Sequence, residues 1–295
     1  MRNEAGQAIL IVLLVMAVVL TVVLSILSRS VTDVTITSRG EESIRAFSAA
    51  EAGIEQGLIL QGYSGSIAQP NFEGASFDAN VDTIGENQPS FVYPLEVAAG
   101  DTATVWFVSH ADDGSLVCDL SHPCFTGSSF KVCFGKPGAY TPTNTPAVEV
   151  SILYLRTAGN YSTAMIARAT YDGNTGRTST NKFDPASGGA CTINNDKNFA
   201  YSATVNLGTG GLAIPSTIYN TQGLLQTATI RLLYNDQPQT LGIDTVSRVL
   251  PSQGKKVEST GVSGEATRKI QVLKLFADLP PVFQSVIYSP SGITK

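Results

Sequence analysis

The sequence predicts an α+β protein in which a long N-terminal α-helix, transmembrane in its first part and amphipathic in its second, precedes a large antiparallel β-sandwich-like head. Three observations support this prediction. Residues Gln7–Ser28 contain no charge, proline or glycine. Residues 29–61 are polar and contain no proline. From residue 90 onward, short runs rich in Val, Ile, Tyr, Phe and Thr alternate with turn residues, a pattern typical of strands.

The apolar run Gln7–Ser28 predicts a membrane helix. As an α-helix it would be about 33 Å long, enough to cross a hydrocarbon core of about 30 Å. Only a helix satisfies the backbone of a single apolar segment in lipid. The run is too long for the apolar region of a cleavable signal peptide, and no Ala-x-Ala-like site follows it directly. Two interpretations remain: a single-pass anchor, or a prepilin whose leader, residues 1–6, is cut between Gly6 and Gln7.

The chain after the membrane run is predicted to continue the same helix to residue 61. Ile44, Phe47, Ile54 and Leu58 recur at spacings of three, seven and four, as on one face of a helix. The β-branched residues of 31–37 locally favour a strand or a loosened helix. The absence of proline and the pattern that follows favour a helix here as well.

A resemblance to a known family rests on this second half. The segment Ser43–Glu55 follows a Gly-Gln-Ala-Ile-Leu start at one helix length. Its most specific part reads Arg-Ala-Phe-x-Ala-Ala-Glu-Ala over residues 45–52, and it resembles the N-terminal region of PilX-type minor pilins of type IV pili. The likeness covers roughly the first 60 residues, a length that fits one long helix.

This resemblance implies a set of partners. A prepilin peptidase would cut after Gly6, the inner membrane would hold the helix before assembly, and other pilins would pack against it in a filament. The outer half of the helix would dock a globular domain. The expected helix assembly face consists of Ile11, Ile44, Phe47, Ala50, Ile54 and Leu58.

One position departs from the major pilins, which carry Glu as the fifth residue of the mature chain. Counted from Gln7, that position is Ile11. A buried carboxylate is costly unless it is paired, so Ile11 removes one electrostatic link to a neighbouring subunit. The resemblance therefore suggests a subunit that initiates or caps a filament.

Composition agrees with an exported structural protein. The chain is 15% charged with a net charge of −5. Beyond residue 60 it has 15 Lys+Arg (19 less 4) against 18 Asp+Glu (24 less 6), a net of −3. This balance argues against a nucleic-acid-binding protein.

A set of basic residues near the C-terminal end of the sequence, the late basic set, is interpreted as solubilising charge on strands. The alternative is a binding patch for DNA or an anionic polymer. The late basic set consists of Arg248, Lys255, Lys256, Arg268, Lys269 and Lys274.

Residues 62–89 are rich in Gly, Ser and Asn and are predicted to be a connector. The head is predicted over residues 90–295, with a split near 187–211 as an alternative. Residues 262–265 fit a hairpin turn, and a proline-containing segment occupies Leu279–Tyr288. The expected strands are 90–96, 102–109, 129–134, 148–155, 162–171, 199–207, 226–234, 241–250, 255–259 and 267–276.

The head contains all four cysteines. An even number on the exported side of a membrane favours two disulfides, for which three pairings are possible. We favour Cys118 with Cys124 and Cys133 with Cys191. A zinc site would recruit His110 or His122, but the spacing lacks the paired C-x2-C of structural zinc sites, so no metal site is expected.

No enzyme motif is recognised, so neither catalytic residues nor a cofactor are predicted. The segment Gly261–Glu265 is not a G-x-S-x-G nucleophile elbow because Glu265 replaces the final glycine. The expected function is therefore a minor pilin or pilin-like filament subunit. The alternatives are a permanently anchored surface adhesin or carbohydrate-binding protein, whose ligand the sequence does not identify, and, least favoured, an anchored hydrolase.

Overall fold

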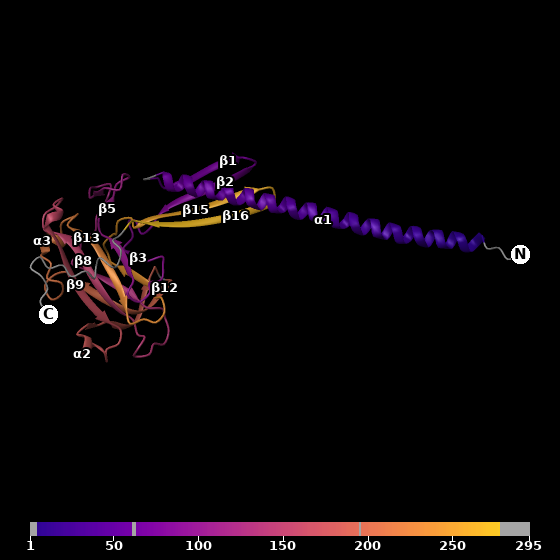
Figure 1. The fold of residues 1–295 in the computed structure, drawn as a ribbon. Helices are drawn as coiled ribbons and strands as arrows, with labels where there is room; N and C mark the ends of the chain where they lie inside the picture. The colour runs from indigo at the N-terminus through magenta and orange to yellow at the C-terminus, as the bar shows by residue number, and fades with distance from the viewer. Residues whose placement is uncertain (1–4, 61–62, 195, 278–295) are drawn as a thin grey trace, which may run out of the picture. The chain divides into compact units, whose positions relative to one another are not determined.

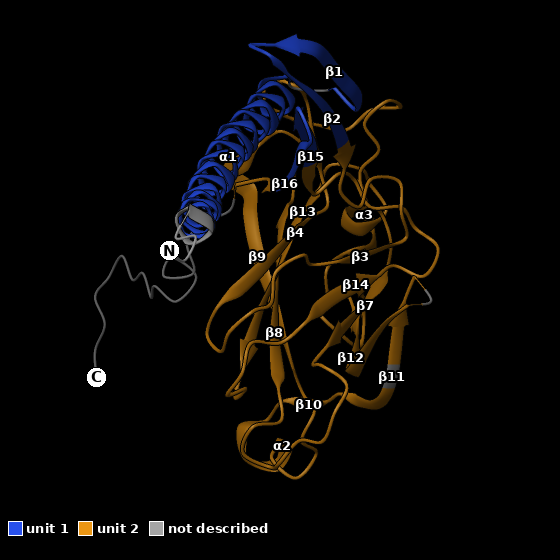
Figure 2. Ribbon diagram, turned by 90° about the vertical axis from the view of Figure 1, so that its right-hand side faces the viewer, with its two compact units in different colours: residues 1–81, 257–272 blue, residues 82–256, 273–295 orange. Residues whose placement is uncertain are grey.

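The computed structural model describes residues 5–60, 63–194 and 196–277 of the chain. The chain divides into two compact units, coloured separately in Figure 2. Unit 1 comprises residues up to 81 together with 257–272. Unit 2 comprises residues 82–256 and the chain from 273 onward. Each unit has its own hydrophobic clusters.

Helix α1 (Ala5–Ile59) in unit 1 is one continuous α-helix of 55 residues (Figure 1). It passes without a break through the β-branched segment, where the hydroxyls of Thr32, Thr35 and Thr37 donate to carbonyl oxygens four residues earlier at 2.8–2.9 Å. Such bonds give polar side chains a local partner on an exposed helix. In the described chain, α1 is the one helix long and apolar enough to cross a membrane.

The sheet of unit 1 has the strand order β1-β2-β15-β16 and lies along the C-terminal part of α1 (Figure 1). Its strands are β1 (Gly65–Phe72), β2 (Ala75–Thr83), β15 (Gly254–Ser263) and β16 (Ala266–Leu275). The expected connector at residues 62–89 is corrected here, because most of it forms the β1–β2 hairpin. Burial alternates along β2 between Ala75, Phe77, Ala79 and Val81, and the hairpin buries these side chains beside α1.

Most described strands of unit 2 form two five-stranded sheets, with orders β10-β9-β8-β13-β4 and β11-β12-β7-β14-β3. The first contains β4 (Thr102–Trp106), β8 (Ala147–Leu155), β9 (Ala164–Asp172), β10 (Asp184–Pro185) and β13 (Leu225–Leu233). The second contains β3 (Ser90–Val92), β7 (Ser129–Phe134), β11 (Ser187–Ile193), β12 (Lys197–Asn206) and β14 (Leu241–Asp244). The shorter elements are β5 (Ser109–His110), β6 (Leu116–Val117), η1 (Tyr161–Thr163), α2 (Thr178–Asn181) and α3 (Ser216–Tyr219).

Both sheets contribute side chains to one hydrophobic cluster. In β8, Val148, Val150 and Ile152 are fully buried and alternate with residues that face the other way. In β7, Phe130, Val132 and Phe134 follow the same period of two. Among the strand pairings described in unit 2, the short contact of β9 with β10 is parallel and the others are antiparallel. The predicted long apolar helix and large, mainly antiparallel β region are therefore present.

The division considered near residues 187–211 does not occur. Strands β11 and β12 pair with each other, and β12 continues the sheet through β7. The predicted turn at residues 262–265 joins β15 to β16, with Gly264 at φ +55°. The proline-containing segment Leu279–Tyr288 lies outside the described residues.

Two disulfides link the cysteines of unit 2, in the pairings favoured from the sequence. Cys118 bonds to Cys124 and closes a short loop, while Cys133 in β7 bonds to Cys191 in β11. The second bond crosses the sheet from β7 to β11, with β12 lying between these two strands. Both cysteines of this pair are buried with Ile193 and Phe199.

Candidate functional site: helix α1 and the sheet beside it

The first part of α1 exposes apolar side chains on every side. From Ile9 to Leu27, each large aliphatic residue is more than 40% exposed. A continuous apolar surface of this kind is unfavourable in water and needs lipid or another apolar surface to cover it. The chain therefore presents a helix whose surface matches a bilayer or a bundle of similar helices.

The second part of α1 buries small residues rather than large ones. Ala46, Ala49 and Ala50 are fully buried, and Gly53 and Gly57 are buried with them. These positions recur three or four residues apart and so occupy one face of the helix. Because their side chains are short, the sheet approaches the helix closely.

The closest approach is backbone to backbone. A Cβ atom added to Gly261 of β15 would meet the carbonyl oxygen of Ala46, and one added to Gly53 would meet the hydroxyl of Ser259. At Gly57 the added atom would lie 2.6 Å from Cγ1 of Val257. Glycine at these positions is therefore required by the space between α1 and β15, not by a special backbone angle.

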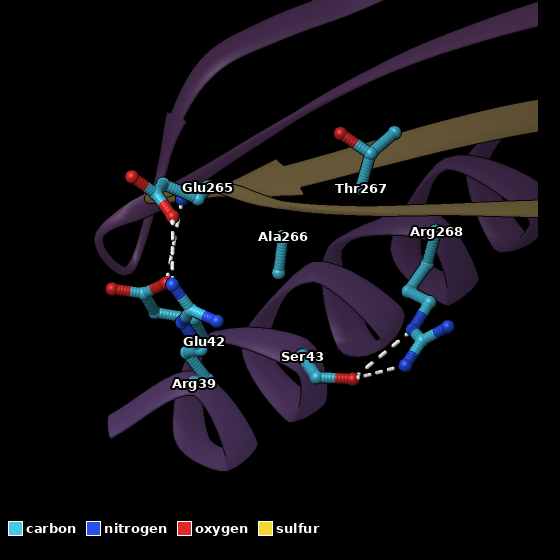
Figure 3. Close-up of a pocket in the computed structure, with 7 residues that line it drawn as sticks. All are labelled: Arg39, Glu42, Ser43, Glu265, Ala266, Thr267 and Arg268. Carbon is cyan, nitrogen blue, oxygen red and sulfur yellow. Dashed lines mark hydrogen bonds and ion pairs between the residues drawn. The ribbon is translucent and has the colours of Figure 1, made fainter. Parts of the chain in front are cut away.

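A polar groove lies where α1 passes the β15–β16 turn (Figure 3). The backbone N–H of Glu265 donates to Oε2 of Glu42 at 3.3 Å, and Arg268 donates from Nη2 and Nε to the Ser43 hydroxyl at 2.6 and 3.0 Å. Arg39 lies 3.7 Å from the Glu265 carboxylate, but both side chains are largely exposed, so this ion pair contributes little. The hydrogen bonds fix the turn against one side of the helix.

The structure divides the expected helix assembly face, and we correct it accordingly. Ala50 and Ile54 face the sheet of the same unit and are buried there. Leu58 is half-buried beside the same cluster. Ile44 and Phe47 are 68% and 46% exposed, and Ile11 is 64% exposed. Only the exposed members remain accessible to another molecule.

The expected assembly face emphasised large residues and included only one of the small ones, Ala50. The signal was present, because alanine or glycine recurs at residues 46, 49, 50, 53 and 57. Gly261, which contacts this face, lies more than 200 residues later, and no local sequence pattern marks it as a contact residue.

The proposed processing pair, Gly6 and Gln7, belongs to the first turns of α1.

The residues considered for a metal do not converge. His122 contacts the Asp119 carboxylate at 3.0 Å, whereas His110 stacks on Phe276 at 3.8 Å between ring centroids. Within the described ranges, no cluster of three or more His, Cys, Asp and Glu could hold a metal ion. In the late basic set, Lys256 pairs with Asp82 and Lys269 with Glu258.

Comparison of the chain with protein-family models, with curated proteins and with solved structures finds no match.

Proposed function

We propose that the protein is a minor pilin or pilin-like subunit of a type IV pilus or a related filament. In this proposal, prepilin peptidase cuts after Gly6, and the apolar part of α1 anchors the subunit as a single pass in the inner membrane. Assembly then transfers the helix into a bundle with other pilins. Burial among those helices replaces the lipid contacts, so that transfer need not expose the apolar surface to water.

The single observation that carries the proposal is the continuity of α1. A tethered surface protein needs a helix only as long as the membrane, about 20 residues. Here α1 extends to Ile59 as 55 residues in one piece, and its second half buries a face of small residues against the sheet. A long helix that is free in its first half and packed in its second supports a subunit of a helical bundle.

We further infer that unit 2 is a sandwich-like extracytoplasmic head. Its two five-stranded sheets share one core in the described chain, which supports face-to-face packing. Its two disulfides are typical of an oxidising compartment outside the cytoplasm. The proposed role is structural, and it assigns no catalytic residue and no cofactor.

Processing is tested by expressing the full chain with a prepilin peptidase and determining the N-terminus of the membrane-extracted protein by mass spectrometry. We expect Gln7 as the first residue, and we expect Gly6→Leu to retain Met1. Gly40→Leu is the matched control, because Gly40 is also a helical glycine and has no atom within 4 Å of an added Cβ. An intact Met1 in the unaltered chain would favour the permanently anchored adhesin.

Assembly is tested separately, in cells that make the filament. We expect Ile44→Glu combined with Phe47→Glu to lower the amount of subunit in sheared filaments at least about tenfold, because two charges would enter an apolar contact. Ser48→Glu adds a charge at an exposed position of the same helix and should change little. The unaltered protein, the double variant and Ser48→Glu are compared at equal membrane levels. Equal amounts of all three in the filaments would contradict the proposed helix contact.

A further inference from the structure

A groove in unit 2 lies over β11, β12 and the loop that follows β7. Pro137 and Gly138 line it from the loop, Gly188 and Gly189 line it from β11, and residues 198–201 line it from β12. Its volume is about 380 Å³, within the range of about 300–1,000 Å³ for small-molecule sites. None of these described lining residues is charged. The groove is therefore a candidate site for a small uncharged ligand.

Glycines keep part of this groove open. An added Cβ atom would meet nothing within 4 Å at Gly138, Gly188 or Gly189. The pairing of β11 with β12 also shifts register between Gly188 and Cys191, and Gly189 adopts φ +116°, a conformation that favours glycine. At such a bulge the extra residue leaves the ladder, so its peptide groups can bond to a ligand. The backbone of β11 thus offers both a donor and an acceptor.

Two side chains of β12 add a polar group and an apolar wall. The Thr192 hydroxyl donates to Oδ1 of Asn198 at 2.7 Å. This bond orients the exposed amide and leaves the two N–H groups of Nδ2 to donate to a ligand. Tyr201 is half-buried and stacks on Phe134 with ring centroids 5.7 Å apart, which fixes the position of its ring.

The loop that carries Pro137 is held in place by hydrogen bonds. The backbone N–H of Lys136 donates to Oε1 of Gln239 at 2.9 Å, and Gln239 is 3% exposed. The Tyr140 hydroxyl donates to the carbonyl oxygen of Lys136 at 2.7 Å. The wall of the groove therefore exists before a ligand arrives, and binding loses less conformational freedom.

This lining selects the chemistry of the ligand. A charged ligand would lose its water without meeting an opposite charge. An extended peptide would need a free strand edge along its length, whereas the groove passes from β11 onto β12, which already pair with each other. A pyranose sugar fits better, because its hydroxyls both donate and accept hydrogen bonds and its C–H face packs on apolar walls.

From these observations we propose that the groove binds an uncharged oligosaccharide. Asn198 and the β11 backbone bind sugar hydroxyls, and Tyr201 and Pro137 contact the C–H face of a ring. The inference concerns unit 2 alone and holds whether or not α1 enters a filament.

Saturation-transfer NMR of the full chain tests the proposal. The micelles are of dodecylphosphocholine, because glycoside detergents would themselves present a sugar. The probes form two pairs of a neutral and a charged sugar: lactose with sialyllactose, and diacetylchitobiose with its deacetylated, cationic form. We expect the neutral member of at least one pair to bind saturably and its charged counterpart to bind at least about tenfold more weakly.

Gly188→Val should abolish this binding by filling the groove. The substitution is compatible with the fold, because Gly188 has no positive φ and an added Cβ meets open space. Ser187→Val is the matched control, since it adds the same side chain to the opposite face of β11 and should leave binding unchanged.

Asn198→Asp separates ligand binding from folding. It keeps the acceptor for the Thr192 hydroxyl but removes the N–H donors, so we expect binding at least about tenfold weaker with an unchanged unfolding midpoint. Three results would overturn the proposal: no saturable binding of either neutral sugar, equal binding of the charged sugars, or undiminished binding in Gly188→Val.

Discussion

Gly261 of β15 lies so close to Ala46 of α1 that a Cβ atom on the glycine would meet the alanine carbonyl oxygen. The contact joins residues 215 positions apart (261 less 46) and determines how near the sheet of unit 1 comes to its helix. Backbone atoms cannot rotate away as a side chain can, so either α1 or β15 must move to admit a larger residue.

Gly261→Ala should therefore weaken the packing of α1 on the sheet by at least about 1–3 kcal/mol. The measurement is amide hydrogen exchange over residues 46–57 of the full chain in micelles, where we expect faster exchange. Gly40→Ala is the control, because Gly40 lies in the same helix with open space around it. That substitution should stabilise the helix by about 0.5–1 kcal/mol. Similar exchange in both variants would argue against the close approach.

The two disulfides should differ in their contribution to stability. Cys133 and Cys191 are 58 residues apart in sequence, whereas Cys118 and Cys124 are 6 apart. In the chain-entropy model, the longer loop stabilises by about 4 kcal/mol and the shorter by about 2 kcal/mol. Denaturant midpoints of the paired cysteine-to-alanine variants would measure both effects. A larger loss of stability on replacing Cys118 and Cys124 than on replacing Cys133 and Cys191 would contradict this prediction.

Acid should destabilise unit 2 through Asp172, which is completely buried. Burial raises the pKa of this carboxyl, but hydrogen bonds from Arg177, Asn174 and Asn181 outweigh it, so the pKa lies below its ordinary value. A lowered pKa means that the stabilisation is present above the unfolded value of about 4 and is lost as pH falls further. Urea midpoints between pH 7 and pH 2 would follow this loss.

In Asp172→Asn, the acid-dependent part of the midpoint should shrink, and the midpoint at pH 7 should fall because Arg177 loses its charged partner. Arg177 also lies over the ring of Tyr234 at 3.8 Å, so some of its packing remains. Asp101→Asn, at an exposed position, is the control. If the urea midpoint of Asp172→Asn depends on pH as in the unaltered protein, a group other than Asp172 causes the loss of stability in acid.

Trp106 fluorescence should depend on pH through His110. Partial burial lowers the pKa of this imidazole below 6.5, so the folded protein favours its neutral form. The resulting stabilisation is present above pH 6.5 and is lost as pH falls through the folded pKa. Protonation beside the indole should also lower the emission with a midpoint below 6.5. This pH transition of the Trp106 emission should disappear in His110→Phe and persist in His122→Phe. The opposite result would show that His110 is not the titrating group.

The sequence alone determined the features that depend on neighbouring residues. The apolar run predicted the first part of α1, and alternation with turn residues placed β7, β8 and β13 to within about one residue at each end. The resemblance at residues 43–55 led to the filament hypothesis, and an even number of cysteines suggested two bonds. The β1–β2 hairpin was missed because its glycines, serines and asparagines are typical of a connector.

Only the tertiary structure decided which face of α1 is covered. The expected face included Ile44 and Phe47, which are exposed. It also included Ala50 and Ile54, which are buried on the same side as Ala46 and Gly53. Local pattern identifies side chains that avoid water, but close packing also depends on how near a distant backbone can come. Gly261 sets that distance, and its partner in α1 becomes evident only when the two segments are folded together.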